Sequence, residues 1–239
     1  MTVTMEIREY GEIQLRGGVL IDCTDGHTYE NSRVGRYLIE QLNMEHIAVI
    51  ESEVFPAIST IINHQPNFPM RVYANQSTKI ACLVSDFIPI QAAEKPLGKA
   101  LVNWAKSKSI ALIITSFQVS AHQIEVDTAG ACSTNNARLR LEQSRIDRLE
   151  SLRITGLPAA LLNEGNWTNV DVISLVLQSV PSGRSVPSIT ERIVQGIDVL
   201  LPEIKFNFKG FNYGIHNRFP LELDPRSPSS SPSSNTTSK

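Results

Sequence analysis

Apolar residues recur along the chain at two spacings, one typical of helices and one typical of buried strands. Between residues 34 and 42 they fall at helical intervals, so a helix with one apolar face is predicted, with Asn31 or Ser32 as its N-cap. Asn43 follows, a residue that tolerates the left-handed conformation that ends many helices. The next segment, His46–Ile50, is short and almost wholly apolar, which is typical of a strand buried on both faces in a parallel sheet.

The same spacings predict further elements along most of the chain. The expected strands are Ala57–Ile62, Met70–Ala74, Lys79–Ser85, Ile110–Ile114 and Val170–Leu177. The expected helices are Gln91–Lys108, which can begin at Pro96, then Ala137–Leu152, Pro158–Asn163 and Pro187–Leu200. The segment 118–134 is ambiguous, because residues 124–127 alternate like a strand whereas residues 129–131 are small. Strands that alternate with helices predict an α/β fold: a mostly parallel central sheet flanked by helices.

Composition narrows the class of protein. Hydrophobic residues make up 41% of the 239 residues, enough for a core, so residues 1–222 are expected to form a single domain. Residues 223–239 are rich in Ser and Pro and are expected to be a disordered tail. A net charge of -2 argues against a nucleic-acid partner. No apolar run is long enough for a membrane span and the first residues lack a signal-peptide layout, so a cytoplasmic protein without a membrane partner is expected.

One short segment gathers groups capable of metal binding or nucleophilic attack: Asp22, Cys23, Asp25 and His27. A zinc site would need paired ligands at set spacing, and a nucleophilic Cys would need a base from elsewhere. A polar turn after the first strand is therefore the preferred interpretation, and no catalytic, cofactor-binding or metal-binding residue is predicted. The three Cys residues are too few for a disulfide framework, and Cys82 lies in an apolar run as a small buried residue.

Turn and strand residues between positions 38 and 73 carry a resemblance to a known family. They are Leu38-Ile39-Glu40-Gln41-Leu42, Glu51, Phe55-Pro56, Pro66 to Pro69 and Arg71-Val72-Tyr73. This pattern is similar to that of the archaeal proteasome assembly chaperone family, and residues 155–162 and 171–175 add a second similar stretch. The resemblance extends from about residue 17 to about residue 201, which is most of a domain.

The resemblance implies a non-enzymatic chaperone that binds proteasome core (α-type) subunits or their assembly intermediates. It also implies a homo-oligomer, for which apolar edges such as Ala57–Ile62 are the candidate contact. Some members of the family carry an ATP-grasp label. The alternative is therefore a small-molecule or nucleotide-binding α/β enzyme, with a site at the carboxyl ends of the strands lined by residues 22–31 and 85–89. A divergent member that binds another partner is a third alternative.

Two departures from the family pattern limit what the resemblance implies. Family members usually have a turn rich in Gly and Pro after the first strand, whereas residues 22–31 carry Asp22, Asp25 and Glu30 and one glycine. Such a loop would repel phosphate, so nucleotide binding there is disfavoured. Several members also dock through a terminal hydrophobic-Tyr-any motif. This chain ends in Asn-Thr-Thr-Ser-Lys, and its similar Phe211-Asn212-Tyr213 is internal.

Two loops place an aromatic ring beside a proline, Phe55-Pro56 and Phe68-Pro69. Exposed aromatic residues on rigid turns anchor interfaces, so these four residues are predicted to bind the partner; the alternative is that both rings fill the edge of the core. The segment 137–152 is rich in Arg, which fits a solvated helix with ion pairs or, alternatively, a partner-binding surface.

Overall fold

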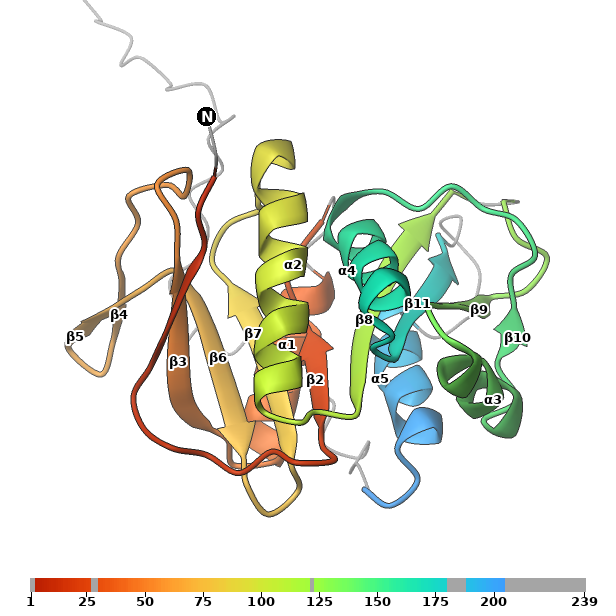
Figure 1. The fold of residues 1–239 in the computed structure, drawn as a ribbon, viewed down its shortest axis with the longest axis horizontal. Coiled ribbons are helices and arrows are strands. Elements are labelled where there is room, and N and C mark those ends of the chain that lie inside the picture. Colours follow the sequence, from red (N-terminus) through yellow and green to blue (C-terminus); the bar gives the residue numbers. More distant parts are fainter. Residues whose placement is uncertain (1–2, 27–29, 121–122, 180–187, 205–239) are drawn as a thin grey trace, which may run out of the picture.

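A nine-stranded sheet forms the middle layer of the computed structural model, which describes residues 3–26, 30–120, 123–179 and 188–204 (Figure 1). Its strand order is β1-β3-β6-β7-β2-β8-β11-β9-β10. In chain order these strands are β1 (Glu6–Glu9), β2 (Val19–Asp22), β3 (Glu45–Glu51), β6 (Met70–Asn75), β7 (Ile80–Ser85), β8 (Leu112–Val119), β9 (Thr128–Cys132), β10 (Asp147–Arg148) and β11 (Val172–Gln178). A separate two-stranded sheet pairs β4 (Thr60–Ile62) with β5 (Gln65–Asn67).

Helices cover both faces of the nine-stranded sheet. The helices are α1 (Glu30–Gln41), α2 (Gln91–Ser107), α3 (Asn135–Gln143), α4 (Gly156–Thr168) and α5 (Ile189–Leu200). α2 and α4 pack together on the face that is nearer the viewer in Figure 1, and α1 and α5 lie behind the sheet with α3 beside them. The molecule therefore has three layers, which confirms the predicted α/β domain with a helix-flanked sheet.

The sheet is mixed, so the prediction of a mostly parallel sheet was wrong in this detail. The pairs β2–β7, β2–β8, β8–β11 and β9–β10 are parallel, and the pairs β1–β3, β3–β6, β6–β7 and β9–β11 are antiparallel. A turn of four residues joins β6 to β7, which is far too short for the crossover that parallel strands need. The apolar composition of β3 correctly predicted that the strand is buried, but it did not predict that the strand runs antiparallel to its neighbours.

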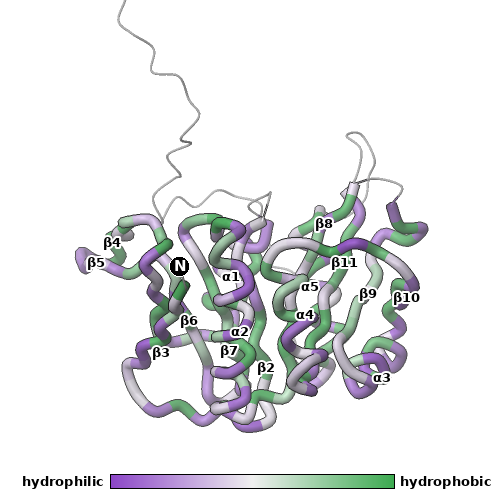
Figure 2. The backbone as a smooth tube through the Cα atoms, turned by 45° about the horizontal axis from the view of Figure 1, so that its top comes forward, coloured by the Kyte–Doolittle hydropathy of each residue, from purple (hydrophilic) through white to green (hydrophobic). Residues whose placement is uncertain are grey.

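Side chains of the central strands alternate between two cores. In β7, Ile80 and Cys82 face the core under α1 and α5, whereas Ala81 and Leu83 face the core under α2 and α4. Figure 2 shows hydrophobic residues gathered in the central strands and hydrophilic residues at β5 and along α3. The buried position predicted for Cys82 is confirmed.

Several predicted elements differ in their bounds. The expected strand 57–62 is reduced to β4, and the Pro-flanked loop after it contains β5. α2 begins at Gln91 and contains Pro96 in its second turn, where the lost amide removes a single helical hydrogen bond. The expected helix 137–152 ends at Gln143, because Arg145 has a positive φ of 55° and β10 follows. Within the ambiguous segment, residues 128–132 form a strand and residues 124–127 do not.

α1 begins at Glu30, so Asn31 and Ser32 lie inside the helix and the prediction that one of them is its N-cap was wrong. Asn43 has the left-handed φ of 46° expected after this helix, which confirms that prediction. α4 is longer than predicted, and Ser188 caps α5 with a capping box. Residues 223–239, the expected tail, lie outside the described residues, as does His27. In the described ranges, no helix is both long and apolar enough to cross a membrane.

Candidate interaction surface

A buried polar cluster lies at the carboxyl end of β2, beside the neighbouring strand β8, on the side of the sheet where an α/β fold commonly binds a ligand. Asp22 Oδ1 accepts hydrogen bonds from the Thr24 amide at 3.0 Å and the Thr24 hydroxyl at 2.7 Å. Its Oδ2 accepts from the Thr115 hydroxyl at 2.7 Å. Burial raises the pKa of Asp22, and these hydrogen bonds lower it by less. The Asp22 carboxylate thus has its acceptors engaged within the protein.

The amino-terminal end of α1 is also occupied by groups of the chain itself. Asp25 Oδ1 accepts a hydrogen bond from the Ser32 amide at 2.9 Å, the position at which a helix start would bind a phosphate. Asn31 donates to the Thr24 carbonyl at 2.8 Å and accepts from the Ser116 hydroxyl at 2.7 Å. These bonds support the preferred interpretation of the 22–31 loop as a polar turn. They also bring Ser116 of β8 to the start of α1. The carboxyl end of β7, from which residues 85–89 continue, lies beside β2 in the sheet.

Cys23 and Cys82 meet in the core on neighbouring strands. Their sulfur atoms are 3.4 Å apart, and both residues are buried and reduced. Burial raises the pKa of Cys23, and its neighbour Cys82 raises it further. A protonated, inaccessible thiol is a poor nucleophile. Among the described residues, no three His, Cys, Asp or Glu side chains are grouped as a metal site requires.

The four residues predicted to bind a partner fall into two pairs. Phe55 is half-buried and packs edge-on against Phe87 with ring centroids 4.9 Å apart, and Pro69 is buried. Pro56 and Phe68 are exposed. The structure therefore assigns Phe55 and Pro69 to the support of the loops and leaves Pro56 and Phe68 facing solvent.

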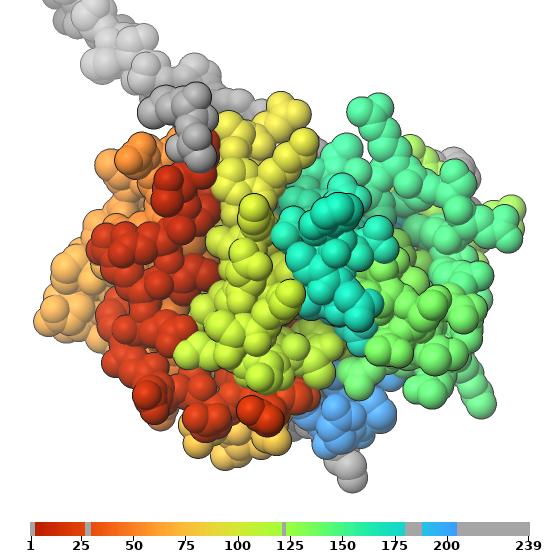
Figure 3. Space-filling model, viewed as in Figure 1, coloured from red at the N-terminus to blue at the C-terminus, as the bar shows by residue number. Residues whose placement is uncertain are grey.

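Further exposed apolar side chains adjoin this pair, and two of them belong to the segment 57–62 that was expected as an oligomer contact. They are Ile58, Ile61, Ile88 and Ile90, with exposed fractions from 41% to 57%. These side chains come from two segments, residues 56–68 and 86–90, that are in contact. The Thr60 hydroxyl donates to Asp86 at 2.5 Å, and the Asp86 amide donates to the Pro69 carbonyl at 2.8 Å. We call Pro56, Ile58, Ile61, Phe68, Ile88 and Ile90 the hairpin surface. The β4–β5 hairpin, which carries Ile61 and is flanked by Ile58 and Phe68, forms the left edge of Figure 3, in orange.

Arg71 holds the two segments of the hairpin surface together from below. This side chain is only 3% exposed. Its guanidinium donates to both oxygens of Asp86, at 2.6 and 2.8 Å, and to the Phe68 carbonyl. A bidentate pair of this kind fixes distance and orientation together. The Arg71–Asp86 pair therefore fixes the position of the loops that carry the exposed isoleucines and Phe68.

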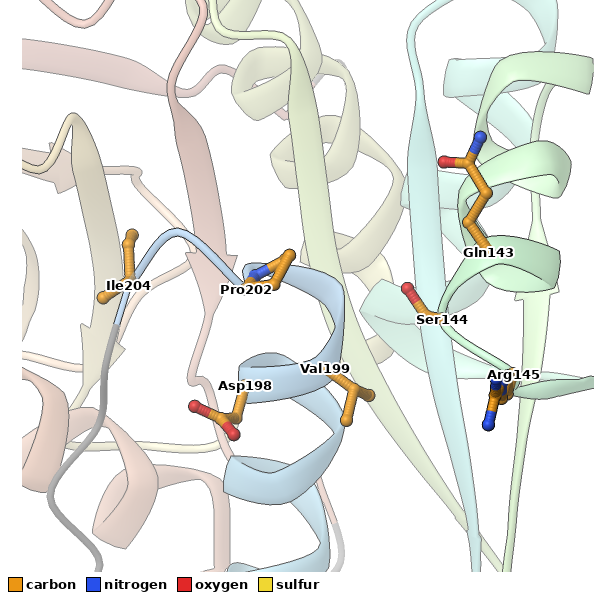
Figure 4. Close-up of a pocket in the computed structure, with 7 residues that line it drawn as sticks. All are labelled: Gln143, Ser144, Arg145, Asp198, Val199, Pro202 and Ile204. Carbon is orange, nitrogen blue, oxygen red and sulfur yellow. The ribbon is translucent and has the colours of Figure 1, made fainter.

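A hollow lies between the ends of α3 and α5 (Figure 4). Asp198 and Val199 project from α5, and Ser144 and Arg145 line the opposite side. Of the Arg-rich segment, Arg138 and Arg148 approach Glu142 at 3.4 and 4.0 Å. These exposed contacts support a solvated helix with ion pairs, the first of the two interpretations of this segment.

Comparison with known proteins identifies the family. The PAC2 family profile matches residues 32–207, which include the hairpin surface and most of the sheet. The chain belongs to the PAC2 family. No curated protein matches the sequence of this PAC2 chain.

Solved structures share its fold. Pyrococcus furiosus PbaA, described as an archaeal homolog of proteasome-assembly chaperone, superposes with a TM-score of 0.73 at 18% identity, covering 87% of this chain and 89% of its own. P. furiosus PbaB, described as an archaeal proteasome activator, gives 0.68 at 15% identity over 86% of this chain and 92% of its own. A Thermoplasma acidophilum protein of unknown function gives 0.65 at 19% identity over 80% and 79%. At these identities the likeness establishes the fold of this PAC2 chain.

Proposed function

We propose that this PAC2-family protein is a chaperone-type protein that binds proteasome core (α-type) subunits or their assembly intermediates. The hairpin surface is the proposed contact. Membership of the PAC2 family supports this proposal, together with a fold shared with PbaA, whose description names a proteasome-assembly chaperone. The exposed apolar residues gathered on one end of the sheet are the observation that carries it.

The chemistry of the hairpin surface suits a protein partner. Neighbouring exposed apolar residues of this kind mark protein interaction sites, and an aromatic ring on a rigid support loses little conformational entropy when it binds. Phe68 and Ile61 are the proposed anchors, held in place by the Arg71–Asp86 pair. Pro56 lies beside them, while Phe55 and Pro69 act indirectly by supporting the loops.

The polar cluster at the carboxyl end of β2 fits a non-enzymatic role, because its carboxylates are bound to neighbouring residues of the chain. We further propose that the protein acts in the cytoplasm as a homo-oligomer, as the family resemblance implies. These two points can be measured independently of partner binding, by fractionation of the native host and by light scattering.

The test is capture of purified α-type subunits of the host proteasome by the full chain, with assembly intermediates captured from host extract in parallel. Ile61→Glu places a charge at the centre of the proposed contact, at a side chain that is 57% exposed. Leu139→Glu makes the same kind of change at a side chain that is 47% exposed on α3, away from the hairpin surface. Ile61→Glu is expected to weaken capture at least about tenfold, since truncating an anchor costs about 2 kcal/mol.

Leu139→Glu is expected to bind like the unmodified chain. Both variants change exposed residues, so both should retain the parent's thermal unfolding temperature. Failure of the unmodified chain to capture subunits or intermediates would overturn the proposed function. Equal weakening by the two variants would overturn the hairpin surface as the contact.

A further inference from the structure

A second concave site lies at the opposite end of β3 and β6 from the hairpin surface. Three segments line it, residues 10–13, 43–47 and 74–77, around a cavity of about 350 Å³. Hydrogen bonds join these segments: Tyr10 N donates to the Ile47 carbonyl at 2.8 Å, and Asn75 Nδ2 donates to the Leu42 carbonyl at 2.7 Å. The Gln14 amide reaches Gln76 Oε1 at 3.4 Å. The cavity is therefore preformed; we call it the Tyr10 cavity.

An aromatic stack forms one wall of the Tyr10 cavity. The His46 ring lies between Tyr73, stacked at 5.0 Å between centroids, and Tyr10, edge-on at 4.9 Å. Tyr10 is 60% exposed, so a face of its ring is open to a ligand. A β-bulge between His46 and Ala48 interrupts the pairing of β3 with β6 at this point. Bulges of this kind redirect side chains and occur often beside functional sites.

The nitrogen Nε2 of His46 is buried and has no hydrogen-bond partner, which is an uncommon state for a buried polar atom. Burial lowers the pKa of His46, and the charge of Arg71 lowers it further, while a hydrogen bond with the Ala48 backbone acts in the opposite direction. A neutral imidazole accepts a hydrogen bond through its unprotonated nitrogen. With its pKa lowered, the His46 ring adds no positive charge to this wall of the cavity.

The charges around the Tyr10 cavity decide the sign of the ligand. Glu12 and Glu45 line it and are exposed, whereas no Lys or Arg is among its described lining residues. Carboxylates disfavour an anion and attract a cation, and an open tyrosine face adds a cation–π interaction. A volume of about 350 Å³ is near the lower limit for ligand pockets, so the ligand is small.

We propose that the Tyr10 cavity binds a small organic cation, a guanidinium or alkylammonium group on a short chain. The cation lies against the Tyr10 ring, and its charge is balanced by Glu12 and Glu45. This site is separate from the hairpin surface and does not depend on the function proposed for it.

The experiment titrates the full chain with N-acetylarginine amide, with its neutral isostere N-acetylcitrulline amide, and with putrescine as the ammonium probe. Calorimetry measures affinity, and the side-chain nitrogen resonances of His46 report contact. Millimolar or tighter binding of at least one cation, with a shift at His46, is expected. Binding of the arginine and citrulline amides with equal affinity, or binding of neither cation, would overturn the proposal.

Variants locate the site. Glu45→Gln is expected to weaken cation binding about threefold, because an exposed charge pair contributes modestly. Glu53→Gln removes an exposed carboxylate in the loop between β3 and β4, at the other end of β3, and is the matched control that should leave binding unchanged. Tyr10→Leu removes the aromatic face from an exposed position and should also weaken binding. Identical affinities of the Glu45→Gln and Glu53→Gln variants would rule out this cavity as the site.

Discussion

Replacing Arg71 with methionine removes a buried charge that joins the two segments of the hairpin surface. The methionine keeps most of the apolar stem and loses the guanidinium. Asp86 then loses two hydrogen bonds, of 2.6 and 2.8 Å, and the Phe68 carbonyl loses its bond to Arg71. Thr60 still donates to Asp86 at 2.5 Å.

The size of the effect follows from burial. Removing one partner of a buried ion pair costs about 3–5 kcal/mol of unfolding free energy, because the other charge stays buried without compensation. Here the Asp86 side chain is 29% exposed and can recover some hydration, whereas Arg71 is almost fully buried. We therefore expect Arg71→Met to cost about 2–3 kcal/mol and Asp86→Asn, which leaves the guanidinium buried, to cost about 3–4 kcal/mol.

Urea unfolding of the parent, both single variants and the double variant measures these costs and their coupling. The double variant should cost about 1–2 kcal/mol less than the sum of the single variants, since neither charge is left without its partner. Hydrogen exchange should rise first in residues 58–69 of the Arg71→Met variant. A loss below about 1 kcal/mol for Arg71→Met, or strict additivity in the double variant, would refute the role assigned to this pair.

Three further predictions concern the interior. Burial raises the pKa of Asp22 above its unfolded value, so its contribution to stability is present below the unfolded pKa and is lost as pH rises through the folded pKa. The unfolding free energy of Asp22→Asn in urea, relative to that of the parent, should therefore increase from pH 4 to 7. A difference that stays constant over this range would contradict the prediction. Iodoacetamide should label Cys132 alone in the native protein and all three cysteines in urea, as intact mass would show, because Cys23 and Cys82 are buried; native labelling of either would contradict the packing. Gly98→Ala places a Cβ 2.8 Å from the Cβ of Ala160. It should lower the free energy of unfolding, measured by heat or urea, by about 1 kcal/mol despite the better helix propensity of alanine. A stabilised variant would show that α2 and α4 separate easily.

The sequence predicted local structure well where apolar spacing was regular. The segment 34–42, the left-handed Asn43 and the burial of Cys82 were all anticipated, because each depends on neighbouring residues or on average burial. The sequence predicted α3 poorly: its helical composition continues past Gln143, but Leu149 and Leu152 pack against a separate small core. Contacts with distant residues decided where that helix ends.

The candidate surface was predicted in part. The Phe-Pro pairs were found because aromatic residues beside proline stand out in a loop. Ile61 was included only as part of the apolar segment 57–62, expected as an oligomer contact, and Ile88 and Ile90 were not found, since an isolated isoleucine in a sequence is usually assigned to the core. Their exposure follows from the way the β4–β5 hairpin and the 86–90 loop project beyond the ends of β3, β6 and β7.

The sequence by itself determined the kinds of elements in this protein, their approximate order and the residues that must be buried, because hydrophobic periodicity is a local property of the chain. Tertiary structure alone decided the direction of the strands and the meeting of Asp22 with Thr115. It also decided the separation of Phe55 and Pro69, which support the loops, from Pro56 and Phe68, which face solvent. Periodicity reports that a side chain is covered, but which distant residue covers it depends on how all the elements pack together.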